Sequence, residues 1–188
     1  MPNRSRRWIA WAALGVAVAA LVVATMALWA RGARGFSARA QPTGMEAWMA
    51  HMMRDMAMPA GANRRTNPYP RLTAAQMKFA SEHFAAHCAA CHANNGDGRV
   101  MLGLNMYPHP PDLRAPGTQG KSDGALFYTI RNGIRMSGMP AWGDDTPKET
   151  WELVDFIRHL PRLTAAQLRR MRAYNPKTIF PEPLMMSH

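Results

Sequence analysis

The chain is poor in cysteine, since its 188 residues contain only Cys88 and Cys91. Two cysteines make half of a tetrahedral zinc site, and the other two ligands would have to come from distant histidines. A redox dithiol of the thioredoxin kind needs a βαβ pattern around the pair, which this sequence lacks. A structural disulfide stays open in an oxidising compartment. The chemistry of the pair therefore has to be judged from the residues next to it.

Strand signals and catalytic motifs are also missing. No segment has the apolar–polar alternation of a β-strand, which predicts an all-α fold. No residues have the spacing of an acid–base or nucleophilic catalytic group. The sequence therefore predicts a protein that is not an enzyme in its own right, and it leaves open a place as a subunit of one.

Acidic residues are few, 12 against 23 lysines and arginines, for a formal net charge of +11. Residues 1–40 hold six arginines and no acid, which leaves 17 basic and 12 acidic residues, or +5, on the remainder. A positive field of this size suits an acidic partner protein, although a solvated basic surface explains it equally. No nucleic-acid-binding motif accompanies the charge, so nucleic acid is not an expected partner.

The one long apolar run extends from residue 8 to residue 30, with 23 positions and no charge. As a helix it would be about 34 Å long, enough to cross a bilayer core of ~30 Å. Trp8, Trp11 and Trp29 lie near its ends, where interfacial aromatic residues belong. Arginines flank both ends almost equally and do not decide the orientation. We predict a single-pass membrane anchor.

A cleaved signal peptide and a soluble periplasmic product are the alternative for this segment. Ala38-Arg39-Ala40 before Gln41 resembles a small-residue cleavage site. The apolar run is longer than a usual signal-peptide core, and the candidate site lies ten residues beyond its end. These two features favour an uncleaved anchor.

The cysteine pair belongs to the run Cys88-Ala89-Ala90-Cys91-His92. Cys-x-x-Cys-His is the attachment motif of c-type haem. Each thiol adds to one haem vinyl group, and the histidine that follows binds the iron as its proximal ligand. The motif occurs once. We therefore predict one covalently bound haem c, with Cys88 and Cys91 as thioethers and His92 on the iron.

Four parts are expected along the chain: a cytoplasmic n-region and anchor at 1–30, a linker at 31–72, a globular domain at 73–161, and a C-terminal helix and tail at 162–188. The capping and apolar patterns predict helices at 44–58, from Thr73 to the cysteines, from Ser122 or Asp123 to Gly133, and at 147–160. The stretches rich in Pro and Gly predict loops at 59–71 and 93–122 and an extended tail at 173–188. Arg-Leu-Thr-Ala-Ala-Gln occurs at 71–76 and again at 162–167, which we interpret as one helix-start sequence used twice.

Several short motifs follow one another in a fixed order after residue 73. They are the Cys-x-x-Cys-His run, Gly96-Asp97-Gly98, Pro110-Pro111-Asp112-Leu113, Ile130-Arg131-Asn132-Gly133-Ile134, Ser137-Gly138-Met139-Pro140 and a final Trp-bearing helix. In this order they resemble the single-haem class I c-type cytochrome domain, over residues 73 to about 160. The resemblance implies that helices 74–88 and 147–160 cross over one haem edge. It also implies haem attachment outside the cytoplasm, and hence a domain in the periplasm at a bacterial inner membrane.

The resemblance further implies Met139 as the distal iron ligand, because this residue precedes Pro140 in a loop between two helices. A thioether opposite histidine raises the haem potential relative to ligation by two histidines. Met136 is a weaker candidate that lacks the Met-Pro context. Less favoured still are Met101, Met106, His109 and His159.

Two further roles stay open at this level. Either Pro110 or Pro111 would supply the backbone carbonyl that accepts the His92 Nδ1 proton. Trp142 and Trp151 either line the haem pocket or belong to ordinary core packing.

Residues 44–58 are rich in methionine. Met45, Met49, Met52, Met53 and Met56 recur at helical spacing on one face, with Trp48 and His51 nearby and Met58 following. One interpretation is an adaptable apolar face that packs on the haem domain, a partner subunit or the membrane. The other is a Cu(I) site, with packing the favoured interpretation. His83 and His87 also have helical spacing, but no third metal ligand accompanies them.

Together these features predict a membrane-tethered periplasmic electron carrier that cycles between Fe(III) and Fe(II) and exchanges electrons with redox partner proteins. The alternative is a permanent cytochrome c subunit of an oxidase or dehydrogenase complex, with 41–72 and 162–188 as docking segments. A haem enzyme or gas sensor would require an open sixth iron position, and therefore that Met139 does not bind.

Overall fold

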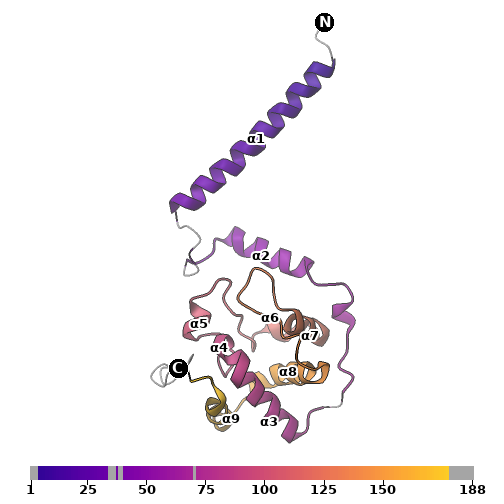
Figure 1. Ribbon diagram of the computed structural model, residues 1–188, viewed down its shortest axis with the longest axis vertical. Helices are drawn as coiled ribbons and strands as arrows, with labels where there is room; N and C mark the ends of the chain where they lie inside the picture. The colour runs from indigo at the N-terminus through magenta and orange to yellow at the C-terminus, as the bar shows by residue number, and fades with distance from the viewer. Residues whose placement is uncertain (1–3, 34–36, 38–39, 70, 178–188) are drawn as a thin grey trace. The chain divides into compact units, whose positions relative to one another are not determined.

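Helices account for the regular structure in the part of the chain that the computed structural model describes, residues 4–33, 37, 40–69 and 71–177, and no strand occurs among them. The α-helices are α1 (Arg4–Ala33), α2 (Gly44–Met56), α3 (Ala74–His83), α4 (Ala89–His92), α5 (Met101–Leu104), α6 (Pro116–Gln119), α7 (Asp123–Asn132), α8 (Pro147–His159) and α9 (Ala165–Met171) (Figure 1). Short 3₁₀ turns lie at Ala62–Arg64, Leu160–Arg162 and Arg172–Tyr174, and a π-helical turn lies at Phe84–Cys88. The predicted all-α fold is confirmed. The chain divides into two compact units, Met1–Gln41 and Pro42–His188.

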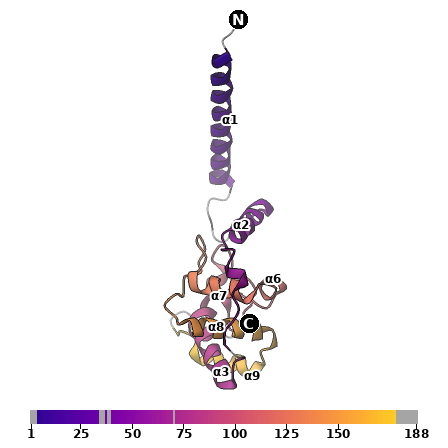
Figure 2. The ribbon, with the colours of Figure 1, turned by 90° about the vertical axis from the view of Figure 1, so that its right-hand side faces the viewer.

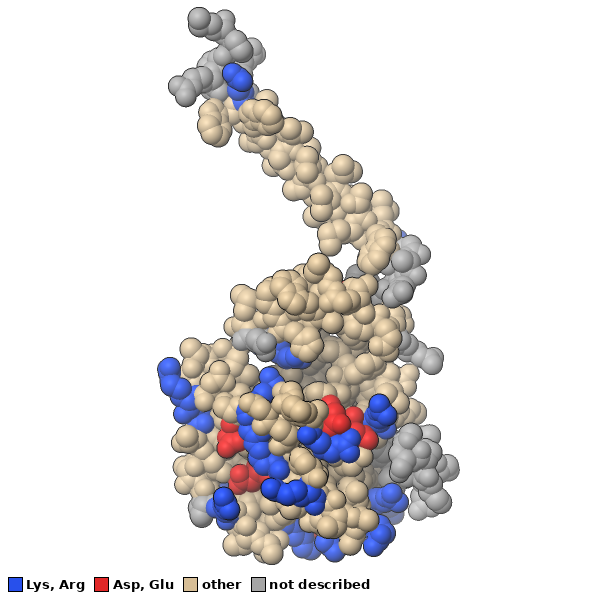
Figure 3. Space-filling model, turned by 180° about the vertical axis from the view of Figure 1, so that it is seen from behind, with Lys and Arg blue, Asp and Glu red and all other residues tan. Residues whose placement is uncertain are grey.

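The first unit contains α1, a single uninterrupted helix (Figure 2). Its stretch Arg7–Trp29 has 23 residues and is long and apolar enough to cross a membrane. The side chains of this stretch are all exposed, and its surface is almost free of charge (Figure 3). A membrane anchor and a signal sequence near an N-terminus share these properties.

Helices of the second unit begin at the residues that the capping patterns predict. Thr73, Thr146 and Thr164 each form a complete capping box, in which the threonine hydroxyl accepts from the N3 backbone N–H and the N3 side chain accepts from the threonine N–H. The repeated hexapeptide therefore starts α3 and α9 in the same way. Ser122 caps α7, and Gly133 ends it with a φ of 64°.

We expect the Thr146→Ala variant to lower the free energy of unfolding by about 1 kcal/mol, the usual effect of removing an N-cap oxygen. The Thr146 hydroxyl accepts from the Glu149 N–H at 3.2 Å, and the α8 helix that follows forms much of the core. Urea unfolding at neutral pH measures the loss. Thr146→Ser, which keeps the oxygen, is the matched control and should stay close to wild type.

The same capping box predicts a pH dependence. The hydrogen bond from the Thr146 backbone N–H is the main cause of the lowered pKa of Glu149. A lowered carboxyl pKa stabilises the fold above the ordinary pKa, and this contribution is lost as the pH falls through the lowered value. The stability difference between wild type and Glu149→Gln should therefore shrink below about pH 4.

The core lies where α3, α7 and α8 meet. Phe84, which directly follows α3, packs on Phe156 of α8 with ring centroids 5.2 Å apart, and both side chains are buried. Trp151 of α8 stacks on Phe127 of α7 with centroids 4.3 Å apart. Trp151 is therefore a core residue, which is the packing role left open by the sequence.

Part of the expected linker packs on this helical core. We call residues 62–67 the strap. Ala62 is buried, and a Cβ placed on Gly124 of α7 would lie 2.1 Å from the Ala62 carbonyl oxygen. The Asn67 side chain donates to Asp155 of α8 at 3.2 Å. The strap is thus held against α7 and α8, which the loop prediction for 59–71 did not anticipate.

The C-terminal helix also packs back on the domain. Met171 at the end of α9 is 1% exposed, and Leu168 contacts the core cluster. Beyond α9, Asn175 is buried and accepts a hydrogen bond from the Asn94 amide at 2.8 Å. The predicted extended tail therefore does not begin at residue 173, and residues 178–188 lie outside the described part of the chain.

Candidate haem-binding site

The polypeptide that carries the two cysteines changes its helical winding directly before them. After α3 the chain forms the π-helical turn Phe84–Cys88 and then α4, which ends at His92. The Ala89 N–H donates to the Phe84 carbonyl across this wider turn. Turns of this kind are rare and often occur at functional sites. The sequence predicts a continuous helix here, and no signal in it distinguishes the π turn.

Cys88 is the last residue of the π-helical turn, and Cys91 lies in α4. Both are free thiols. Burial raises the pKa of the Cys88 thiol to about 12, with Asp145 and Cys91 adding to the effect. Burial also raises the pKa of Cys91. A redox dithiol requires a lowered thiol pKa, so the raised values argue against that alternative.

His92 presents a neutral, buried imidazole. Burial lowers its pKa to about 4, against a smaller opposing effect of the Pro111 backbone carbonyl. Neutral imidazole is the form that binds a metal ion through a ring nitrogen. The Nδ1 atom is buried and has no hydrogen bond of ordinary geometry. Of the two prolines left open by the sequence, Pro111 is the one whose carbonyl acts on this ring.

The loop after His92 folds back over the helix end. Ala93, Gly96 and Gly98 have positive φ values of 60°, 81° and 71°. The Gly98 N–H donates to the His92 carbonyl at 2.9 Å. A Cβ on Gly98 would lie 2.7 Å from the Pro110 carbonyl oxygen, so only glycine permits this approach. The loop thereby holds the two prolines beside the histidine.

A second loop, residues 133–146, carries Met139 between α7 and α8. The Ile134 N–H donates to the Met139 carbonyl at 3.2 Å, and the Trp142 N–H donates to the Ile130 carbonyl at 3.1 Å. The Ser137 hydroxyl accepts from the Met139 N–H at 3.2 Å. These bonds close the loop on itself and on the end of α7. We call it the Met139 loop.

The loop separates the two methionines that the sequence left as candidates. Met139 is partly buried and packs against the core cluster. Met136 is 87% exposed and has a φ of 59°. The structure thus brings the Met139 thioether to the core and leaves Met136 in solvent.

A comparison with known protein families covers this same region. The family model described as "Cytochrome C oxidase, cbb3-type, subunit III" matches residues 75–157, which run from the first turn of α3 almost to the end of α8. Residues 75–157 are a c-type cytochrome domain. The domain indicates haem c and an electron-transfer function. None of the curated proteins compared with the chain matches it.

The residues of the cytochrome domain fit haem c. The fit rests on two free thiols three residues apart, a histidine whose buried Nδ1 has no ordinary hydrogen bond, and a thioether that packs against the core. Thiols and a neutral imidazole are the groups that covalent attachment and proximal ligation use. Among the residues that the structure describes, no group of three or more His, Cys, Asp or Glu side chains is placed to hold a metal ion instead.

Of the remaining candidate ligands, His109 and His159 have hydrogen-bond partners, Met101 is exposed, and Met106 lies against the Met139 loop. Met101 is 54% exposed, and a Cβ on Gly138 would lie 3.0 Å from the Met106 sulfur. The His109 Nδ1 pairs with the Gly103 carbonyl at 3.2 Å, and the His159 ring pairs with the Gln167 amide at 3.4 Å.

His83 at the end of α3 and His87 in the π-helical turn contact aromatic and acidic neighbours. The His83 and His87 rings lie 4.9 Å apart, and His87 lies 5.3 Å from the Trp142 ring. The His83 ring lies 3.5 Å from the Asp145 carboxylate, which belongs to the Met139 loop. The two histidines therefore join α3 and the π-helical turn to the Met139 loop. The spacing alone did not reveal this role.

Arg131, part of the Ile130–Ile134 motif, bonds to the Met139 loop, a role that no pattern in the sequence indicated. Its guanidinium donates to the carbonyls of Gly143 and Asp145, each at 2.7 Å, and lies 5.8 Å from the centroid of the Phe127 ring. Both carbonyls belong to the Met139 loop. Arg131 therefore ties the far side of this loop to α7.

Removing this guanidinium should loosen the Met139 loop. A hydrogen bond to a charged group contributes about 1.5–3 kcal/mol, so we expect Arg131→Ala to lower the free energy of unfolding by about 2 kcal/mol. The weak red absorption band that reports sulfur bound to ferric iron should also be lost at a lower pH than in wild type. Arg135→Ala, at an exposed arginine of the same loop, is the control. Equal effects of the two substitutions would contradict the role of Arg131.

Proposed function

We propose that this protein is a membrane-tethered, single-haem electron carrier with its cytochrome domain in the periplasm. The observation that carries the proposal is the occurrence of the Cys-x-x-Cys-His motif and a partly buried methionine in one c-type cytochrome domain. Cys88 and Cys91 would hold the haem as thioethers. His92 and Met139 would be the two axial ligands.

Haem c supplies a reversible one-electron Fe(III)/Fe(II) couple when bound. The residues of the chain set the conditions for it. The Pro111 carbonyl acts on the His92 ring and would accept the Nδ1 proton, which would leave the other ring nitrogen for the metal. The Met139 loop would supply a soft thioether as the second iron ligand, which would favour the reduced state and exclude water and other ligands.

The tether and the charge bear on how electrons would arrive and leave. Arg7–Trp29 would hold the domain at the membrane, so that an encounter with a membrane-bound partner needs only a search in two dimensions. Lysine and arginine side chains outnumber acidic ones on the face of the second unit in Figure 3. This surface favours acidic redox partners, whose association would be faster at low ionic strength.

A permanent subunit of a respiratory oxidase is the second candidate function. The description of the matching family names an oxidase subunit. The strap and the segment 162–175 pack on their own domain, however, so they are not free docking arms. Purification in mild detergent separates the candidates, because a permanent subunit would copurify with its complex in fixed stoichiometry.

The function is tested on the purified full-length protein in detergent. We expect one haem per chain that survives denaturation, and a redox titration with a slope of about 59 mV per decade, the value for one electron. The ferrous protein should not bind carbon monoxide. Rapid carbon monoxide binding, together with absence of the red sulfur-to-iron band, would favour an open sixth position and would sink the electron-carrier proposal.

The tether is tested on the same preparation. An intact mass that includes residues 1–40, with resistance to carbonate extraction from membranes, is the result expected for an anchor. A mass that begins at Gln41 would show cleavage and a soluble product.

A further inference from the structure

The most apolar side of α2 is exposed to solvent. Five methionines share this face, and their exposed fractions lie between 40% and 77%: Met45, Met49, Met52, Met53 and Met56. On the opposite side of the helix, Ala47 and Arg54 are partly buried. The interpretation that the methionine face packs on the haem domain is therefore wrong. Within the second unit, none of the residues that the structure describes covers this face.

The composition of the methionine face indicates what binds to it. Residues 44–58 contain six methionines and no leucine, isoleucine, valine or phenylalanine. A lipid surface or a protein interface selects apolar area, which leucine supplies as well as methionine does. Methionine differs from leucine in its unbranched, adaptable side chain and in its soft thioether sulfur. Thioethers are ligands that select Cu(I).

The spacing allows several sulfur atoms to meet at one ion. Residues three and four apart on a helix are neighbours, with Cβ atoms about 5–6 Å apart. Met49, Met52, Met53 and Met56 are linked in this way, as steps of three or four residues. Methionine has an unbranched side chain with three rotatable bonds, so neighbouring sulfur atoms can turn toward a shared point.

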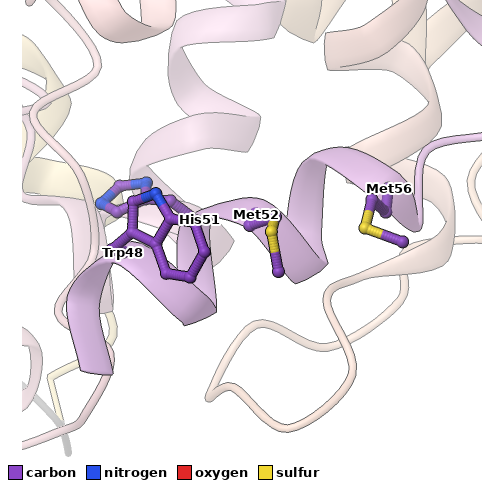
Figure 4. Close-up of a pocket in the computed structure, with 4 residues that line it drawn as sticks. All are labelled: Trp48, His51, Met52 and Met56. Atoms are coloured by element: carbon purple, nitrogen blue, oxygen red, sulfur yellow. The ribbon is translucent and has the colours of Figure 1, made fainter. Parts of the chain in front are cut away.

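The surroundings of Met52 and Met56 suit a monovalent cation. Trp48, His51, Met52 and Met56 line a shallow hollow along α2, with Trp48 and Met52 on successive turns of the same side (Figure 4). The face of an indole ring attracts cations. The Arg54 guanidinium, by contrast, donates to the His51 Nδ1. This bond engages the His51 ring, so the thioethers and not the imidazole would bind the ion.

We propose that α2 binds one Cu(I) ion through the thioethers of Met49, Met52, Met53 and Met56, with the Trp48 ring beside it. The site lies outside residues 75–157 and needs no residue of the haem site. It therefore holds or fails independently of the proposed electron-carrier function.

The experiment is a competition titration of the full-length haem protein with Cu(I) and a chromophoric Cu(I) chelator, under anaerobic reducing conditions. The test variant replaces Met49, Met52, Met53 and Met56 by leucine, which keeps the apolar area and removes the sulfur. Wild type should take up one Cu(I), and the leucine variant should bind it at least about tenfold more weakly. Met101→Leu, at an exposed methionine of α5, is the matched control and should bind like wild type.

Three results would overturn the proposal. They are a wild-type protein that takes no Cu(I) from the chelator, a leucine variant that binds as tightly as wild type, and a Met101→Leu variant that loses as much affinity as the leucine variant. The first is the result expected if α2 docks on lipid or protein, because such a surface needs no metal ion, and the second would mean that Cu(I) binds elsewhere in the protein. An unchanged haem spectrum and helical circular dichroism of each variant make sure that the fold is intact.

Discussion

Replacing Met139 by alanine should lower the reduction potential of the haem and remove the red band of sulfur-bound ferric iron. Axial ligands set haem potentials over a range of about 0.8 V, and we expect a decrease on the order of 0.1–0.2 V here. The physical reason is that a thioether stabilises ferrous iron more than water does. The ferrous variant should also bind carbon monoxide, since alanine leaves the sixth position open.

Met136→Ala is the matched control for this prediction. Met136 lies three residues earlier in the same loop and is 87% exposed. Its replacement should leave the potential, the red band and the resistance to carbon monoxide as in wild type. A potential that falls in Met136→Ala and not in Met139→Ala would mean that Met136, and not Met139, binds the iron.

Gly133→Ala should destabilise the domain and loosen the distal side of the site together. Gly133 has a φ of 64° and a ψ of −169°, a region of backbone space used almost only by glycine. A Cβ there would lie 2.7 Å from both the Met139 carbonyl oxygen and the Pro140 carbonyl carbon. These are backbone atoms, so the loop itself has to move. We expect the free energy of unfolding to fall by about 3 kcal/mol, from backbone strain and overlap.

Gly117→Ala provides the control for the glycine prediction, because a Cβ at Gly117 meets no atom within 4 Å. Urea unfolding and the red band are measured on both variants. A loss of stability in Gly133→Ala that leaves the band untouched would mean that the loop shifts without moving the Met139 sulfur, and would separate stability from ligation.

The resemblance to c-type cytochromes came from short motifs, and the family match over residues 75–157 confirms a c-type cytochrome domain. Helix starts were predictable for a similar reason. A capping box is made by a residue and its third neighbour, so Thr73, Thr146 and Thr164 carry their signal within four positions. The stop of α7 at Gly133 is equally local. Each of these features depends on residues that are adjacent along the chain.

The roles that the sequence left open depend on contacts between distant segments. Pro110 and Pro111 are indistinguishable as neighbours in a loop, and only the return of this loop to His92 selects Pro111. Trp151 became a core residue through its stacking on Phe127. The strap was read as loop because Pro and Gly punctuate it, whereas its place is decided by the absence of a side chain at Gly124.

The methionines show the same division most plainly. The sequence by itself determined that Met139 lies in a loop before a proline and that the methionines of α2 share one helical face, because both are matters of spacing. Only the tertiary structure decided that Met139 packs against the core while Met136 and the α2 face stay exposed. Burial is set by whatever other parts of the chain cover a side chain, and no local pattern contains that information.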